Sequence, residues 1–362
     1  MKPHFADLLR CPHCRGPLAL RLSKVEFVKR RAATPPFCSG LCAMPSPGRP
    51  CVACLQIDIV EGALSCTPCA REYRIDEGIP WMAPGQQIDD EEKRRTASSF
   101  GHLWAQSVPD PEAEPRDYHF EKLAGALGFA SPRGTLLDAG CGDGIDLGHR
   151  ARMPDVEVVG AELSTGGCRT TAQRIRALPN AHIVQADLAR LPFADGTFDF
   201  AYSYGVLHHM PKPDDGLSDI ARVAKPGAEV AIYLYEDFSD RSAVWRAALA
   251  LANWPRALTT RLPHRLLFAL CQLGSPVVFA TLTLPHRLLR RIPSLRPFAN
   301  TLPFRHGTGP FSMTGDLYDR FSAPVEFRYS RSGTEAFVAR AGLALRAIAK
   351  ERGWMALAER PR

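Results

Sequence analysis

The chain has 362 residues, of which 45% are hydrophobic and 23% charged, and a formal net charge of +7. These values are ordinary for a soluble globular protein, and the length allows one sizeable domain and an accessory one. The first residues contain no apolar segment, which argues against a secretory signal. Eleven cysteines in such a chain favour metal ligation or free thiols over disulfides, so we expect a cytoplasmic protein.

Residues 1–84 form a cysteine-rich module with two Cys-x-x-Cys pairs, Cys11/Cys14 and Cys66/Cys69. Two such pairs predict a zinc ribbon with four thiolate ligands, and a site without an open position is structural. Four more cysteines lie between the pairs: Cys38, Cys42, Cys51 and Cys54. We favour a nested arrangement, in which the outer four cysteines hold one zinc and the inner four hold a second. The alternatives are a ribbon that joins Cys51/Cys54 to Cys66/Cys69, loss of metal from one set, and a redox role.

The outer pairs lie in the frames LLRCPHCRGPL, at residues 8–18, and GALSCTPCAREYRIDEGIP, at residues 62–80. These frames resemble the small zinc-ribbon proteins that activate tRNA and release-factor methyltransferases, a module also found fused ahead of methyltransferase domains. The resemblance implies a module without chemistry of its own, which braces the core or presents substrate. A segment this short depends on bound metal for its folding energy.

Residues 85–99 form a polar linker, and residues 100–236 form a core in which predicted strands alternate with helical stretches. Five segments of the core follow in order, at residues 136–144, 156–164, 181–193, 196–210 and 217–236. This alternation predicts an α/β fold with a parallel sheet that is covered by helices.

The first segment reads LLDAGCGDG, an apolar run with Asp138 near its end and then Gly140, Gly142 and Gly144 at alternate positions. Positions without side chains let the backbone turn sharply from a strand into a helix, and let a ligand lie against main-chain N–H groups. Such turns bind nucleotide-like cofactors at the carboxyl ends of strands, although the spacing differs from the dinucleotide form. Glu162 ends the second strand at the spacing of an acid that binds a ribose.

The five ordered segments resemble the class I S-adenosylmethionine-dependent methyltransferases, and most closely the group that includes the ubiquinone and menaquinone biosynthesis methyltransferases. The resemblance implies a Rossmann-like, seven-stranded sheet with helices on both faces, and S-adenosylmethionine as the cofactor. The residues that it assigns to the cofactor are Asp138, Gly140, Cys141, Gly142 and Gly144 for the methionine part, Glu162 and Leu163 for the ribose, Asp187 and Leu188 for the adenine, and Ser203 and Tyr204 near the sulfonium.

Two further features lie near the expected active site. Phe100 and Trp104 belong to an F-G-x-x-W segment that resembles the one that folds over the cofactor in related enzymes, where an aromatic ring adds cation–π attraction. Packing of an N-terminal helix is the alternative. His208 and His209 lie in the loop after the fourth strand, where a base that takes the acceptor's proton is expected. Their alternative role is to fix this loop through hydrogen bonds to the backbone.

Residues 237–310 form an arginine-rich insert. Between Arg241 and His306 the sequence has ten arginines, no lysine and no acid, so the basic character of the chain is concentrated here. Residues 266–284 are uncharged and about as long as a membrane span, but the Gly-Ser-Pro sequence at 274–276 is expected to break the segment. We consider a helical lid over the active site and a lid that also contacts an anionic membrane or substrate, and we favour a true span least.

Together, these observations predict an S-adenosylmethionine-dependent methyltransferase with one or two structural zinc ions, cytoplasmic or peripheral to the membrane. Residues 311–362 are expected to complete the methyltransferase domain. The expected acceptor is a small apolar or lipid-like molecule that is methylated on oxygen or carbon. A second hypothesis is an RNA methyltransferase, although the insert lacks interleaved aromatic residues for base stacking. A third is a cofactor-binding scaffold without turnover.

Overall fold

The structure is a computed structural model that describes residues 1–28, 56–83, 90–106, 118–302, 304 and 307–362. It divides into two compact units, the first made of Met1–Asp240 and Val325–Arg362 and the second of Arg241–Pro324. The insert expected from sequence ends at residue 310, and the second unit continues for fourteen residues beyond that point, to residue 324.

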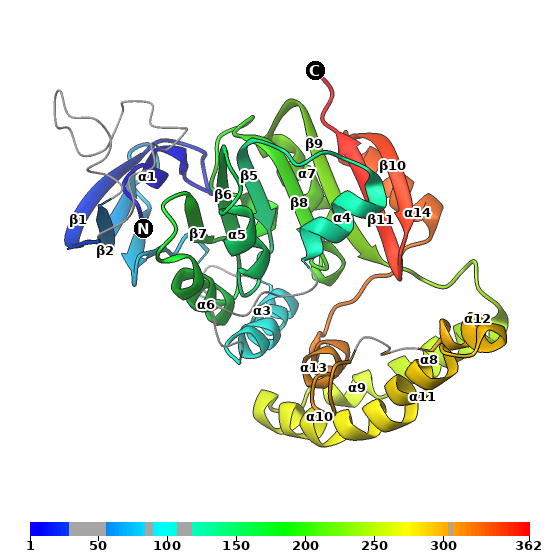
Figure 1. The fold of residues 1–362 in the computed structure, drawn as a ribbon. Coiled ribbons are helices and arrows are strands. Elements are labelled where there is room, and N and C mark those ends of the chain that lie inside the picture. Colours follow the sequence, from blue (N-terminus) through cyan, green and yellow to red (C-terminus); the bar gives the residue numbers. More distant parts are fainter. Residues whose placement is uncertain (29–55, 84–89, 107–117, 303, 305–306) are drawn as a thin grey trace. The chain divides into compact units, whose positions relative to one another are not determined.

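The first unit contains a seven-stranded sheet in the order β10-β11-β9-β8-β5-β6-β7 (Figure 1). Its strands are β5 (Gly134–Ala139), β6 (Val156–Glu162), β7 (Ala181–Gln185), β8 (Phe198–Tyr204), β9 (Ala224–Tyr235), β10 (Ala344–Lys350) and β11 (Gly353–Glu359). The first five pair in parallel, whereas β11 is antiparallel to both of its neighbours. The predicted α/β architecture is therefore confirmed, and the strand order reverses between β5 and β8.

Helices alternate with these strands along the chain. They are α3 (Glu91–Trp104), α4 (His119–Leu127), α5 (Ile145–Arg150), α6 (Thr165–Ile175), α7 (Pro213–Val223) and α14 (Arg331–Arg340). α3 begins within the segment expected to be a linker, because the Asp90 side chain accepts a hydrogen bond from the Lys93 N–H and acids occupy its first turn. Ser164 caps α6 in the same way.

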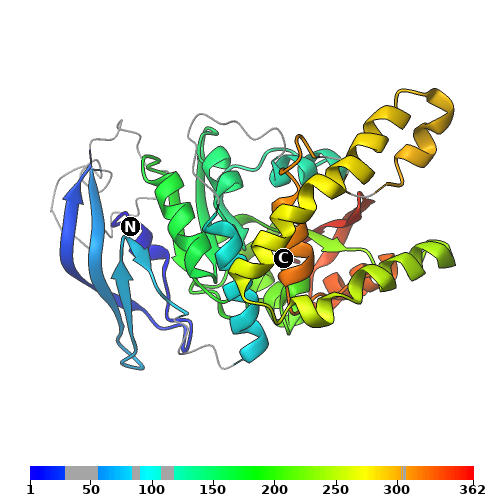
Figure 2. The same ribbon diagram turned by 90° about the horizontal axis from the view of Figure 1, so that it is seen from below.

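The N-terminal module is an antiparallel four-stranded sheet preceded by one helical turn (Figure 2). Its elements are α1 (Phe5–Leu8), β1 (Leu18–Phe27), β2 (Ile57–Cys66), β3 (Glu72–Asp76) and β4 (Ile79–Pro80). Trp81, which follows β4, pairs in parallel with Gln185 of β7, and Leu9 pairs with Phe193. The module therefore covers part of the exposed edge that β7 would otherwise present to solvent.

A buried polar cluster joins the module to the core sheet. His4 Nε2 and His182 Nε2 lie 3.1 and 2.7 Å from the same oxygen of Glu157. Burial lowers the pKa of His182 to about 3 and outweighs the hydrogen bond and the charge of Glu157, which act in the opposite direction. Burial opposes ionisation of Glu157, but the two imidazoles outweigh it and hold the pKa of this carboxyl well below its usual value.

We expect acid to destabilise the fold through this cluster. Below pH ~6.5 the unfolded chain protonates His182 while the folded chain keeps it neutral, so the free energy of unfolding falls by up to about 1.4 kcal/mol per pH unit. Glu157 adds a loss at lower pH, since its depressed pKa stabilises only the ionised state. The free energy of unfolding can be measured by urea titration followed by circular dichroism. Between pH 7 and 5 it should fall less steeply for His182→Gln than for the wild-type protein. Equal pH dependence of the two proteins would contradict this assignment.

The second unit is helical. It contains α8 (Ala243–Asn253), α9 (Arg256–Thr259), α10 (His264–Val278), α11 (Leu284–Leu289), α12 (Arg296–Ala299) and α13 (Thr314–Ser322). The expected break at residues 274–276 is wrong, because α10 continues through Pro276 and a π-helix at Phe279–Thr283 joins it to α11. Proline removes one backbone donor and crowds the carbonyl four residues earlier, and here this disturbance does not end the helix.

Candidate active site

A pocket lies at the carboxyl ends of β5, β6 and β8, beside the point where the strand order reverses. This is where open α/β sheets bind their ligands. Eleven of the residues predicted from sequence line it: Phe100, Trp104, Gly140, Cys141, Gly142, Glu162, Leu163, Asp187, Leu188, Tyr204 and His209. Segments far apart in the sequence therefore meet at one site.

The glycine turn after β5 provides the floor of this pocket through its shape. Gly140 has φ +90°, and a Cβ there would lie 2.4 Å from Val206 Cγ2. A Cβ on Gly142, at φ +56°, would lie 3.0 Å from the indole of Trp104. The N–H groups of Gly140 and Cys141 donate to Ala161 O, and that of Gly142 donates to Glu162. The turn thus allows close approach, while these three N–H groups are already bonded within the protein.

Glu162, at the end of β6, is buried and shapes the same turn. Its two oxygens accept hydrogen bonds from Ser164 N at 2.7 Å and Gly142 N at 3.1 Å. Burial raises the pKa of this carboxyl above its usual value. A carboxylate has about four acceptor positions, so Glu162 retains capacity for a further donor.

Four predicted residues are not on the pocket wall. Asp138 lies beneath it, where its carboxylate accepts a 2.7 Å hydrogen bond from the Tyr202 hydroxyl and burial raises its pKa well above the usual value. Ser203 donates to Ala139 O at 2.8 Å. Gly144 packs against Thr171, and His208 is buried behind the loop. Asp138 and Ser203 therefore fix the strand ends on which the wall is built.

The carboxylate of Asp187 is held by two groups, one of which comes from the first turn of α3. Lys93 Nζ lies 2.6 Å from one carboxylate oxygen, and the Ala189 N–H donates to the other at 3.0 Å. Lys93 also lines the pocket and is not among the residues predicted from sequence. Its position depends on α3 folding back onto the strand ends, which no local pattern indicates.

Asp146 and His119 also line the pocket and are not among the residues predicted from sequence. His119 Nδ1 lies 3.2 Å from one oxygen of Asp146, and the Phe120 N–H donates to the other. Burial favours the neutral acid, but these contacts outweigh it and hold the pKa of Asp146 below its usual value. Asp146 continues the alternate spacing of the glycine turn and was recognisable there, whereas His119 stands outside any motif.

Phe100 and Trp104 of α3 are half-buried on the pocket wall. Gly166 of α6 allows α3 to approach closely, since a Cβ on Gly166 would lie 1.9 Å from Gly101 O. Phe100 also contacts the ring of His209, with centroids 5.1 Å apart. The F-G-x-x-W segment therefore joins α3, α6 and the loop after β8.

The two loop histidines have different surroundings. His209 lines the pocket, its Nδ1 lies 2.8 Å from Val325 O, and its Nε2 is buried without a protein partner. Because a carbonyl only accepts, Nδ1 carries the proton and Nε2 presents a lone pair. Both ring nitrogens of His208 are buried without a partner, and its ring packs on Tyr235 with centroids 3.9 Å apart. Burial holds the pKa of His208 well below its usual value, so this ring stays neutral.

The outer cysteines of the N-terminal module form a second candidate site. All four sulfurs lie within 4.8 Å of one another, with Cys11 3.6 Å from Cys69 and Cys14 3.4 Å from Cys66. A tetrahedral Zn–S distance of about 2.3 Å places sulfurs roughly 3.8 Å apart, so the arrangement fits zinc. Burial opposes ionisation of the Cys11 thiol, but hydrogen bonds from Tyr73 and from the backbone of Cys14 and His13 lower its pKa to about 6.

The inner cysteines, Cys38, Cys42, Cys51 and Cys54, lie outside the described residues, so a second zinc stays a prediction. The remaining thiols are embedded in the fold. Burial raises the pKa of Cys141 and Cys168 well above the usual value, and that of Cys271 to about 11. Cys141 fills space against Gly160, where a Cβ would lie 2.7 Å from its sulfur.

The fold and pocket define a doubly wound α/β domain of the kind that binds a nucleotide-like cofactor at its switch point. Residues 137–232 match the family described as a methyltransferase domain, and residues 2–78 match the Trm112p-like protein family. The chain therefore carries a Trm112p-like module followed by a methyltransferase domain.

Curated relatives match part of the chain. Methyltransferase GfsG of Streptomyces halstedii is 32% identical over 136 residues, covering 37% of this chain and 49% of the relative. O-methyltransferase rstn1 of Aspergillus nomiae is 35% identical over 130 residues, covering 34% and 58%. The chain thus spans about half the length of these relatives. The solved structure of geranyl diphosphate C-methyltransferase from Streptomyces coelicolor A3(2) aligns with 12% identity and a TM-score of 0.43, covering 73% of this chain and 97% of that one.

Proposed function

We propose that the protein transfers a methyl group from S-adenosylmethionine to oxygen or carbon of a small apolar acceptor. The observation that carries this proposal is the pocket at the switch point, where the glycine turn, Glu162 and His209 share one wall. The methyltransferase domain match over residues 137–232 and relatives named as methyltransferases support it.

The pocket residues have chemistry that fits this cofactor. Glu162 has acceptor capacity for the ribose hydroxyls, and Asp187 with Leu188 borders the position expected for the adenine. The aromatic rings of α3 would attract a sulfonium through cation–π interaction. S-adenosylmethionine supplies an already activated methyl group, so the protein mainly has to orient the acceptor and exclude water.

His209 is the proposed general base. Its Nδ1 is fixed by Val325 O, and its unpartnered Nε2 is able to take a proton from a hydroxyl or an acidic C–H as the new bond to methyl forms. His208 is proposed to be structural, since it lies off the wall and packs on Tyr235. The proposal thus gives each histidine one of the two roles considered for the pair.

The four outer cysteines are proposed to hold a structural zinc that stabilises the module against the edge of β7. Thiolate ligands without an open position supply folding energy rather than chemistry. The clustered sulfurs and the match of residues 2–78 to the Trm112p-like family support this role.

Methyl-labelled S-adenosylmethionine tests the acceptor class when it is incubated with the protein and separate lipid, small-molecule and RNA extracts. We expect label in an organic-soluble product. Label in RNA would replace the proposal with the RNA methyltransferase hypothesis. Cofactor binding without label in any fraction would favour a scaffold.

A further inference from the structure

The second unit exposes an apolar stripe along its longest helix. On α10, Leu266, Leu270, Leu273 and Val277 are 48, 48, 74 and 62% exposed. Their spacing of four, three and four residues places them on one helix face. Leu284 and Leu288 of α11 are also exposed, and we call these six residues the α10–α11 stripe.

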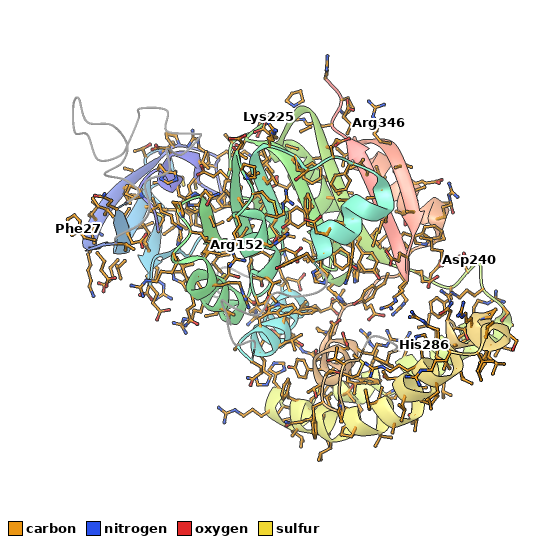
Figure 3. The ribbon with its side chains drawn as sticks, viewed as in Figure 1. Phe27, Arg152, Lys225, Asp240, His286 and Arg346 are labelled. Carbon is orange, nitrogen blue, oxygen red and sulfur yellow. The ribbon has the colours of Figure 1, made fainter. Side chains whose placement is uncertain are left out.

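The other face of the same helix is anchored within the unit. Leu267, Cys271 and Ser275 are buried, and α10 packs on α13. Ser275 Oγ donates to Pro310 O at 2.8 Å and accepts from the Met313 N–H. His286, labelled in Figure 3, lies with its Nδ1 2.8 Å from Ala299 O and so ties α11 to α12. The stripe therefore belongs to a helix whose packing within the unit is already satisfied on a different face.

A second group of exposed apolar residues lies on α8 and α9. Val244, Leu251, Trp254 and Leu258 are 75, 73, 78 and 68% exposed. Soluble monomers rarely expose contiguous apolar surface on this scale unless it binds a partner. Leucine with an interfacial tryptophan is the composition of helices that lie in the surface of a bilayer.

The charged residues of this unit are predominantly positive. No Asp or Glu occurs between Asp240 and Asp316, whereas Arg246, Arg261, Arg265, Arg290 and Arg291 are exposed. We infer that the second unit docks on an anionic phospholipid bilayer, with the α10–α11 stripe in the interfacial layer and the arginines on lipid headgroups. This partner goes beyond the proposed methyl transfer, and it would bring the enzyme to the place where apolar acceptors concentrate.

The same features argue against two other partners and against a membrane span. Two copies of this unit would bring arginine-rich surfaces together, with only Asp316 and Asp319 in each copy to offset the positive charge. A nucleic acid would find mainly aliphatic side chains between the arginines, where base stacking needs aromatic rings. The stretch His264–Leu289 is the one described helix long and apolar enough to span a membrane, and 22% of its apolar window is buried. A span would nevertheless take α13, with Asp316 and Asp319, into the hydrocarbon.

Co-sedimentation of the full-length protein with vesicles tests this inference. We expect binding to phosphatidylcholine vesicles that contain phosphatidylglycerol, little binding to phosphatidylcholine alone, and release by alkaline carbonate. Arg290→Gln with Arg291→Gln should weaken the partitioning by about tenfold or more, since each basic residue near the surface contributes about 1 kcal/mol. Leu273→Asn with Val277→Asn should weaken it at constant charge.

Cofactor binding by each variant serves as the control for folding, so failure of docking is distinguishable from failure of the proposed transferase activity. Equal binding to neutral and anionic vesicles, or none to either, would overturn the inference. So would resistance to carbonate, which indicates a span. A concentration-dependent dimer that the stripe variants abolish would assign the surface to a second copy, and tighter binding to RNA than to vesicles would assign it to nucleic acid.

Discussion

Replacing His209 with asparagine is expected to lower kcat for methyl transfer by about 10²- to 10⁴-fold, the range that general-base catalysis supplies. Asparagine can still donate to Val325 O, which His209 Nδ1 contacts at 2.8 Å, but it offers no basic nitrogen at the Nε2 position. Affinity for S-adenosylmethionine should change little, because the ribose and adenine contacts are assigned to other residues. Steady-state kinetics with the labelled acceptor, beside a cofactor titration, measures both effects.

A second substitution separates catalysis from structure. His208→Asn is the matched control, since it makes the same chemical change on a ring that lies off the pocket wall. It is expected to lower stability and to leave kcat of the folded protein near the wild-type value. A full loss in His208→Asn with normal turnover in His209→Asn would reverse the assignment.

Replacing Cys66 with serine is expected to remove one equivalent of zinc and to unfold the N-terminal module. The free energy of unfolding of the module is expected to fall by about 5 kcal/mol or more. Structural zinc supplies about 10–16 kcal/mol of apparent binding energy in zinc-finger peptides. Metal analysis should show one equivalent fewer than in the wild type. Hydrogen exchange should show lost protection in β1 to β4, while the central strands β5, β6 and β8 stay protected.

Cys271→Ser is the control for this change, because Cys271 is a buried cysteine of the second unit outside the outer zinc cluster. It should keep the wild-type zinc content and module protection. Unchanged zinc and exchange in Cys66→Ser would show that the four clustered sulfurs do not hold a metal.

The central strands and their connecting turns were predictable because each combines an apolar run with a glycine or acid at its end. The glycine turn is an example, since the positive φ at Gly140 and the crowding by Val206 leave room for no side chain. The pocket residues that come from the surrounding helices were not predictable. His119 and Lys93 reach the pocket from helices whose placement depends on tertiary packing, and neither stands in a recognisable motif.

Two sequence expectations failed for local reasons. Main-chain N–H groups of the glycine turn were expected to face the ligand, but those of Gly140 and Cys141 are bonded to Ala161 O at the end of β6. The sequence cannot show this, because the pairing depends on the register between β5 and β6. The Gly-Ser-Pro sequence at 274–276 was expected to break the apolar segment, and α10 continues through it instead. Placement of the insert as a lid stays a prediction.

Calorimetric titration of S-adenosylmethionine and S-adenosylhomocysteine tests the central claim most directly. We expect the zinc-loaded wild-type protein to bind both at micromolar concentration. Glu162→Ala should bind at least about tenfold more weakly, because hydrogen bonds to a charged group contribute about 1.5–3 kcal/mol. Glu72→Ala, which removes an exposed carboxylate of the N-terminal module, should bind as the wild type does. Absence of binding to a folded wild-type protein would contradict the assignment of the pocket and, with it, the proposed methyl transfer.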